Sequence, residues 1–119
     1  MIGDGGFAEA RERVREALAA IGSGDPQSYI DCWAEDGDVT LFGAWGPIER
    51  GHDHVAETFR WVGHRFEGGG LVPEDSVAVA SGSLAYTVGF ERGEVVVDGG
   101  PPQPMVIRVT HIYRRFGDA

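Results

Sequence analysis

Three side chains in the second half of the chain are of the types that perform acid–base chemistry on a bound organic molecule. Glu91 provides a carboxylate, Arg108 a guanidinium and Thr110 a hydroxyl. Desolvation in an apolar pocket raises the pKa of a carboxylate toward neutrality, whereas a neighbouring guanidinium lowers it. If Arg108 anchors a carbonyl or carboxylate of a substrate, Glu91 is left to act as the general acid or base. A purely structural ion pair is the alternative.

A long strand near the end of the chain determines where Arg108 and Thr110 point. Residues 105–116 (MVIRVTHIYRRF) are mostly β-branched, aliphatic or aromatic, which predicts a strand. Its odd face carries Met105, Ile107, Val109, His111 and Tyr113, and its even face carries Val106, Arg108, Thr110, Ile112 and Arg114. We expect the odd face to pack on helices or on a second subunit, and the even face to line a pocket.

Pairing with the preceding strand then decides whether these side chains meet Glu91. If the connecting hairpin is symmetric about Gly100–Pro101, Glu91 lies opposite Thr110 and diagonal to Arg108 on the same face. A carboxylate, a guanidinium and a hydroxyl would then converge inside a mostly apolar cone, as polar groups do in ligand pockets. This arrangement predicts Glu91 as the catalytic residue and Arg108 and Thr110 as ligand-binding residues.

Large aromatic side chains are the second group of candidate ligand contacts. A bulge at Arg92–Gly93 would reverse the hairpin register and bring Tyr86 and Phe90 into the pocket instead. The three tryptophans occupy a helix end, a strand end and a position beside the buried stripe of a helix. Core filling is the usual role of a tryptophan, but these positions suit a pocket mouth or a dimer seam. They are Trp33, Trp45 and Trp61.

A metal site is the next possibility, because His52, His54 and Glu57 lie close together in the sequence. Residues two apart on a helix do not face one another, and on a loop such histidines are usually solvated or capping residues. We therefore expect no metal site. Asp31, Glu35, Asp36 and Asp38 form an acidic cluster around a helix end, which we interpret as solvated rather than catalytic.

The remaining nucleophiles and bases have simpler interpretations. Cys32 lies beside Trp33 in a short helix, where a buried, inert thiol is the usual case. His64 is a general base by type, but we expect an exposed helix residue. His111 lies on the odd face of the long strand, so we expect it at an interface rather than in the pocket.

Composition excludes several classes of function. The 119 residues are 42% hydrophobic, which fits one soluble domain over residues 1–119. A net charge of −9 repels nucleic acid and anionic membranes. The single cysteine, the lack of a signal-peptide pattern and the lack of a ~20-residue apolar run predict a cytoplasmic protein. The sequence contains no nucleophile elbow, no phosphate-binding glycine loop and no dinucleotide fingerprint, so covalent, phosphoryl and hydride chemistry lack their usual motifs. Proton transfer without a cofactor is the type of catalysis that remains.

The order of predicted elements indicates an α+β fold. Apolar residues at helical spacing predict helices over 7–21, from Asp25–Pro26 to about Glu35, and over 53–66. A strand is predicted over 38–45, between the second and third helices. Gly68–Gly70 is expected to end the third helix, and Pro73 to lie at an edge or entry position of a strand. From Val77 onward an antiparallel meander is expected, with a break at 92–93 and a hairpin loop over 98–103.

This order resembles the nuclear transport factor 2-like superfamily, most closely its SnoaL-like branch. The resemblance rests on G-D-P…Y-I-D-C-W-A-E-D, on R-G-H-D-H-V and on R-V-T-H-I-Y-R-R-F-G, and it extends over residues 7–117. It implies a cone-shaped α+β barrel in which three N-terminal helices pack on a curved, mainly antiparallel sheet. It also implies a pocket inside the cone and a homodimer formed through the outer sheet face. Members include ketosteroid isomerases, polyketide cyclases, limonene epoxide hydrolase and oligomerisation domains without chemistry.

Two departures from the family pattern narrow the function. Leu41 occupies the position of the ketosteroid isomerase catalytic carboxylate, and Ala17 lies near that of its oxyanion tyrosine, so that mechanism is not expected. Leu41 is instead expected to line the pocket. Members of this branch commonly continue after R-R-x-G into another strand, which we expect to be missing here. We therefore predict an isomerase, cyclase or hydratase-type enzyme acting by proton transfer on a small apolar molecule, or a non-catalytic ligand-binding or assembly domain.

Overall fold

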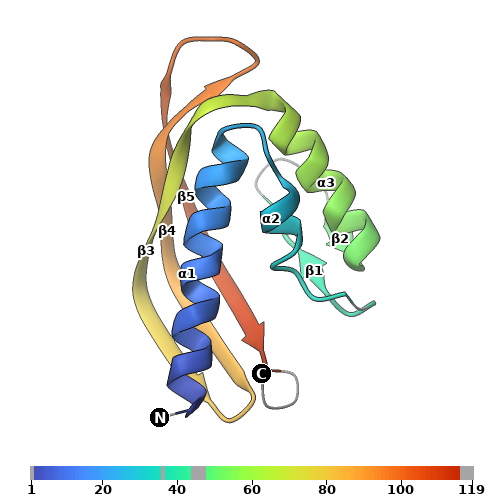
Figure 1. Ribbon diagram of the computed structural model, residues 1–119, viewed down its shortest axis with the longest axis vertical. Helices are drawn as coiled ribbons and strands as arrows, with labels where there is room; N and C mark the ends of the chain where they lie inside the picture. The colour runs from blue at the N-terminus through green and yellow to red at the C-terminus, as the bar shows by residue number, and fades with distance from the viewer. Residues whose placement is uncertain (1, 36, 44–47, 116–119) are drawn as a thin grey trace.

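The structure, a computed structural model, describes residues 2–35, 37–43 and 48–115. The helices are α1 (Ile2–Gly22), α2 (Gln27–Ile30) and α3 (His52–Arg65). A small sheet pairs β1 (Thr40–Leu41) with β2 (Glu49–Arg50), and a large sheet contains β3 (Phe66–Ser81), β4 (Leu84–Val97) and β5 (Gln103–Arg114). Figure 1 shows α1 lying along the large sheet, with α2 and α3 to one side. The predicted α+β class is confirmed, and its curved sheet is consistent with the predicted cone.

The large sheet is an antiparallel meander in the order β3-β4-β5. β3 is therefore an edge strand, as the proline at position 73 predicts. The predicted break at 92–93 is wrong, because β4 pairs continuously with β5 through both residues. The predicted glycine linker at 68–70 is also wrong: β3 begins at Phe66, directly after α3, and includes all three glycines.

The hairpin between β4 and β5 has a different register from the predicted one. Glu91 lies opposite Ile107, not Thr110, so the hairpin is symmetric about Gly99. The physical reason is the turn itself: Asp98 and Gly99 adopt left-handed backbone conformations, with φ of 52° and 71°, and close a tight turn ahead of the two prolines. The Asp98 amide also donates to the Arg65 carbonyl at 2.8 Å, which ties the turn to the end of α3.

This register places Glu91 on the same face as the odd-numbered residues of β5, instead of the predicted even-numbered ones. Odd-numbered residues of β5 pair with odd-numbered residues of β4, so His111 and Glu91 share the inner face. The even-numbered residues of β5 point to the outer face, where they are exposed. The odd face packs toward the helices, as expected, and residues of both faces of β5 border the large cavity described below.

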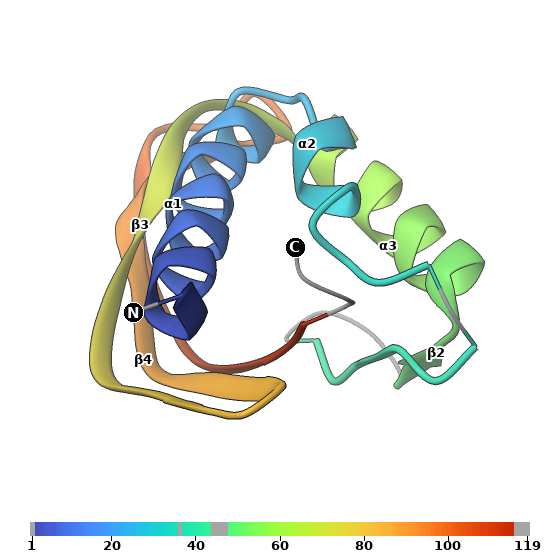
Figure 2. The same cartoon turned by 60° about the horizontal axis from the view of Figure 1, so that its bottom comes forward.

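A bulge in β3 bends the sheet around α1. The pairing shifts between Asp75 and Val77, which leaves Ser76 as the extra residue. Gly89, opposite Asp75, carries no side chain, because a Cβ there would collide with the carbonyl oxygen of Glu74. Figures 1 and 2 show the three long strands curving around α1.

The helices partly match the predicted ones. α1 buries the predicted stripe but begins earlier, at Ile2. α2 has only four residues, because the chain leaves the helix through short-range turns in which Cys32 donates to the Tyr29 carbonyl and Trp33 to the Ile30 carbonyl. Asp25 accepts a hydrogen bond from the Gln27 amide at 3.2 Å, but the N-cap of α2 is Pro26, one residue later than predicted.

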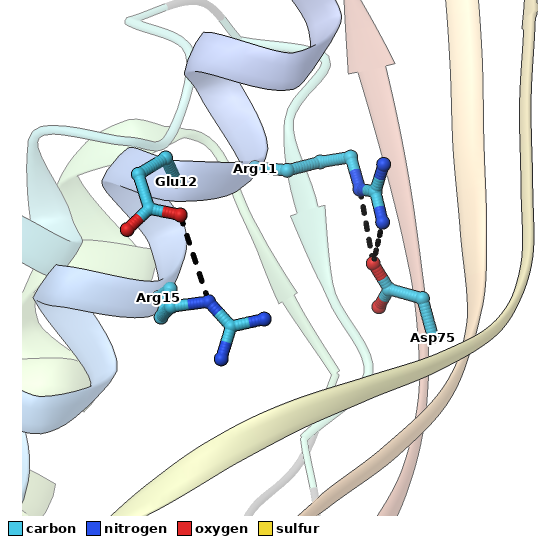
Figure 3. A network of polar contacts seen from close by, with 4 residues as sticks. All are labelled: Arg11, Glu12, Arg15 and Asp75. Atoms are coloured by element: carbon cyan, nitrogen blue, oxygen red, sulfur yellow. Dashed lines mark hydrogen bonds and ion pairs between the residues drawn. The ribbon is translucent and has the colours of Figure 1, made fainter.

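One hydrophobic core joins the helices to the start of the large sheet. It consists of Val14, Ala17, Leu18, Ile21, Tyr29, Ile30, Val55, Ala56, Phe59, Phe66, Leu71 and Val95. At its other end α1 is tied to β3 by a bidentate contact, in which Arg11 Nη2 and Nε donate to Asp75 Oδ2 at 2.7 and 3.0 Å (Figure 3). Among the described residues, no helix is both long and apolar enough to cross a membrane.

Candidate functional site

A large cavity lies between the inner face of the sheet and the helices. Its volume is about 1990 Å³, above the roughly 300–1,000 Å³ of typical small-molecule pockets. Figure 2 shows α2 and α3 on the same side of the sheet as α1. The predicted pocket residues Trp33, Leu41 and Trp61 are among its lining residues, as are Tyr29, Glu91 and His111.

Three polar side chains from three elements meet on the wall of this cavity. Tyr29 comes from α2, Glu91 from β4 and His111 from β5. The Tyr29 hydroxyl lies 3.3 Å from His111 Nε2, and Glu91 Oε2 lies 3.9 Å from the same nitrogen. The first distance is within hydrogen-bond range and the second is about 1 Å too long. Tyr29, His111 and Glu91 thus form a row of three groups that can carry a proton, with the imidazole in the middle. We call this row the polar line.

Glu91 is the only carboxylic acid of the three, and its pKa is raised. Its side chain is buried, with the residue only 5% exposed, and burial raises the pKa of Glu91 from its ordinary value of 4.5 to about 7. Among the described residues, Oε2 of Glu91 has no hydrogen-bond partner. A buried carboxyl oxygen without a partner is rare in folded proteins and marks a place where a ligand or water completes the structure.

The pKa values of His111 and Tyr29 are shifted in directions that keep both side chains uncharged. Burial lowers the pKa of His111, with a smaller opposing effect from the negative charge of Asp75. Burial, followed by the charge of Glu91, raises the pKa of Tyr29 well above its ordinary value. Near neutral pH the imidazole is therefore neutral and the phenol protonated, so the 3.9 Å contact between His111 and Glu91 is not an ion pair there. Glu91 alone is poised between its two protonation states.

Aromatic rings form the wall around this polar line. Tyr29 contacts Phe59 and Trp33 edge-on, with ring centroids 4.7 and 6.0 Å apart. Trp33 in turn lies 5.2 Å from Phe59 and 6.3 Å from the His111 ring. Such contacts hold the rings in one arrangement and exclude water from the polar groups between them. The site is thus apolar with a small set of convergent polar groups, as binding pockets are.

The other predicted site residues do not converge on Glu91. Arg108 and Thr110 are among the residues that line the large cavity, but they belong to the outer face of β5 and are exposed, and Tyr86 is exposed on the outer face of β4, opposite Ile112. Their predicted convergence with Glu91 is wrong, because the hairpin turn at Gly99 shifts the register by an odd number of residues. Trp61 is 50% exposed and packs against the Arg65 guanidinium, 4.7 Å from its ring. Trp45 lies outside the described residues.

Tyr29 and His111 are site residues that the sequence-based reasoning missed. Tyr29 was assigned to the apolar side of a helix, and His111 to an interface. The signal for His111 was its odd position: in any register that pairs odd with odd residues, it shares a face with Glu91. Tyr29 had no such signal, because its meeting with β5, 82 residues away, depends on the tertiary fold.

The other candidate chemistries gain no support from the structure. No cluster of potential metal ligands occurs among the described side chains. His52 Nδ1 lies 3.2 Å from the Ala34 carbonyl oxygen, so this histidine joins α3 to the preceding loop. Cys32 is exposed, not buried as predicted, and its pKa is raised by partial burial, which disfavours the thiolate nucleophile. His64 is exposed on α3, as predicted.

Solved structures of similar fold support the assignment of the architecture. A protein from Streptomyces avermitilis, provisionally described as a dehydratase of the NTF2-like family, matches with a TM-score of 0.75 and 20% identity, covering 94% of this chain and 84% of its own. An NTF2-like protein from Anabaena variabilis matches with a TM-score of 0.62 and 20% identity, covering 98% of this chain and 82% of its own. An LEH-like epoxide hydrolase from M. tuberculosis matches with a TM-score of 0.54 and 16% identity, covering 92% of this chain and 73% of its own.

These identities are too low to carry more than the fold, and no curated protein matches the sequence. The family comparison is more direct, because the SnoaL-like domain matches residues 14–118. That range includes α2, the whole of the large sheet and all three members of the polar line. The chain belongs to the SnoaL-like domain family, and its fold is that of the NTF2-like structures described above.

Proposed function

We propose that this protein is a cofactor-independent enzyme that transfers protons within a small, largely apolar organic molecule bound in the large cavity. The observation that carries the proposal is Glu91, a buried carboxyl with a pKa of about 7 that faces a neutral imidazole across 3.9 Å. A general acid or base works best when its pKa is near the operating pH. We further propose that residues 1–119 form one domain, since a single core joins the helices to the sheet.

The three polar groups have separate roles in this proposal. Glu91 takes a proton from the substrate or gives one to it. His111 stands next to Glu91 and accepts or returns a proton at Nε2, while the Tyr29 hydroxyl holds that nitrogen in place. The only cause of the raised pKa of Glu91 is burial, with no contribution from a cation.

The names of two similar structures agree with this chemistry. One is provisionally described as a dehydratase and another as an epoxide hydrolase. Removing water from an organic molecule and opening an epoxide both require proton transfer to or from oxygen. A shared fold does not carry a shared activity, so these names support the class of reaction only.

The test is a search for turnover that depends on Glu91. Apolar hydroxylated compounds, enones and epoxides are incubated with the protein in D₂O, and products are followed by mass spectrometry. We expect at least one compound to gain deuterium or to change in mass, and we expect Glu91→Gln to abolish that change. Glu94→Gln is the matched control, because Glu94 is an exposed carboxylate on the same strand.

The competing function is non-catalytic ligand binding or assembly. It predicts retention of compounds without deuterium incorporation, and equal behaviour of the Glu91→Gln variant and the wild type. If no compound in the set reacts but some bind, the proton-transfer proposal is wrong and this second function takes its place.

We also propose that the protein self-associates as a homodimer through the outer face of the large sheet. Large apolar side chains are exposed there to an extent that is unusual for a monomer. They are Val77, Val79, Leu84, Tyr86, Val88, Val106 and Ile112. All belong to the outer face of β3, β4 or β5, and Leu84 and Ile112 also border the large cavity.

A further inference from the structure

A second, smaller cavity lies on the other side of Glu91, between α1 and the sheet. Its volume is about 190 Å³. Glu91 and His111 line both cavities, so the catalytic pair forms part of the wall between them. The side chains that line only the small cavity come from α1 and β3. They are Ala8, Arg11, Arg15, Pro73 and Asp75.

The charges around the small cavity cancel one another. Arg11 is paired with Asp75 at 2.7 Å, and Arg15 lies 3.6 Å from Glu12, as Figure 3 shows. A cavity with balanced charges does not select an anion or a cation. Its wall mixes these charged groups with apolar residues such as Val14 and Pro73, so it suits a small polar molecule better than an extended apolar one, for which the large cavity is available. The ligand that fits this chemistry is neutral, small and able to donate and accept hydrogen bonds.

Water meets all these conditions. Each water molecule occupies about 30 Å³ in the liquid, so the small cavity has room for about six. Glu91 Oε2 lacks a hydrogen-bond partner among the described residues, and the terminal torsion of a glutamate is soft enough to turn either oxygen toward the cavity. The Arg11–Asp75 pair is partly exposed, with side-chain exposures of 38% and 19%, so it stands between this cavity and solvent.

We propose that the small cavity is the water compartment of the active site, that its waters hydrogen-bond to the Glu91 carboxyl, and that the reaction is therefore the addition or removal of water. The inference rests on the function proposed above and adds the class of reaction. The organic molecule occupies the large cavity, and water enters or leaves through the small one. The organic molecule and the water therefore reach Glu91 by separate routes.

The chemical step balances without an oxidant or a reductant. In the direction of elimination, one member of the Glu91–His111 pair takes the proton from a carbon and the other gives a proton to the hydroxyl on the adjacent carbon. The carbon–hydrogen electron pair becomes the new double bond, the carbon–oxygen bond breaks with its electron pair on oxygen, and water departs. Addition of water is the reverse, so each group ends the cycle able to start the opposite direction.

Two substitutions on α1 separate the compartments. Ala8 lines only the small cavity and Ala10 only the large one. We expect a high-resolution crystal structure of the wild type to show ordered water within hydrogen-bond distance of the Glu91 carboxyl in the small cavity. Ala8→Phe displaces those waters, whereas Ala10→Phe leaves them in place. A dry small cavity in the wild type overturns the inference.

The second measurement uses any substrate found in the Glu91-dependent search, assayed in H₂¹⁸O. We expect solvent oxygen in the product of addition, or loss of the mass of water in elimination. Turnover falls by roughly tenfold to a hundredfold in Ala8→Phe, because misplaced reactants cost about that much. A Glu91-dependent product with the same elemental composition as its substrate overturns this inference but leaves proton transfer intact. Ordered water without any Glu91-dependent product overturns the proposed function itself.

Discussion

At the scale of single residues, the cost of burying Glu91 is the clearest property of the site. Its pKa is about 7 in the folded protein and 4.5 ordinarily. Its contribution to stability is therefore complete below about pH 4.5 and is lost as the pH rises through about 7. The shift corresponds to about 3 kcal/mol between these limits. We expect Glu91→Gln to match the wild type near pH 4 and to unfold at higher denaturant concentration near pH 8, as urea titrations across this range will show.

Burial of His111 affects the pH dependence of stability in the opposite direction to burial of Glu91. The two effects can therefore be told apart. The folded pKa of His111 is depressed, so its contribution is complete above the ordinary value of 6.5 and is lost as the pH falls through the folded value. Both the wild type and Glu91→Gln retain this term, so their difference isolates Glu91. Glu94→Gln, altered at an exposed carboxylate, serves as the control. A variant that is less stable than the wild type near pH 8 would mean that the Glu91 carboxylate is favourably solvated.

The Tyr29 hydroxyl is the second residue whose role can be isolated. Tyr29→Phe keeps the ring contacts with Phe59 and Trp33 and removes only the contact with His111. We expect a loss of about 1 kcal/mol in the free energy of unfolding, because a buried partner loses its hydrogen bond. We also expect the pKa of His111, followed by NMR, to move. Tyr86→Phe, at a tyrosine exposed on the outer face of the sheet, is the control, and equal effects of both variants would contradict the role assigned to Tyr29.

At the scale of elements, the bulge in β3 is what brings α1 against the sheet. It turns Asp75 inward to meet Arg11 and turns Val77 outward. Gly89 on β4 permits this geometry, because a Cβ there would collide with the backbone of β3. We expect Gly89→Ala to destabilise the fold by roughly 1–3 kcal/mol, as overpacking does. Thermal unfolding measures this effect.

A second glycine tests whether the effect belongs to the bulge. Gly68 also lies in β3, but the nearest atom to an added Cβ is Val96 Cγ2 at an ordinary 3.8 Å. Gly68→Ala should therefore cost clearly less than Gly89→Ala. Similar losses in the two variants would show that any added side chain in these strands is harmful, and that the close approach at the bulge is not special.

At the scale of the whole molecule, the outer face of the sheet exposes large apolar side chains that a second subunit would cover. Ile112 is 76% exposed and Val106 55%, both on β5. Exposed apolar residues on one face favour self-association through that face. We expect a stable dimer in sedimentation velocity at micromolar concentration, and a monomer after Ile112→Asp. Glu57→Arg on α3, away from this face, should leave the dimer intact. A compact wild-type monomer would contradict the proposal.

The order and type of the long elements could be predicted from the sequence alone, because they depend on local patterns. The helical spacing of α1 and α3, the meander after Val77 and the turn before β5 are all present in the structure. The family resemblance follows from the same order and is confirmed over residues 14–118. Glu91 was identified by its type and its place on a strand with an apolar pattern.

The members of the site beside Glu91 were decided only by the tertiary structure. The left-handed conformations of Asp98 and Gly99 move the centre of the hairpin, so Glu91 faces Ile107 instead of Thr110, a shift of three residues. An odd shift exchanges the faces of a strand, because side chains alternate with a period of two. It places His111 inside and Arg108 outside, and the packing of α2 then brings Tyr29 to His111. The sequence alone thus determined the order of the long elements and the candidate acid Glu91, and the hairpin turn and the helix packing determined which side chains lie beside it.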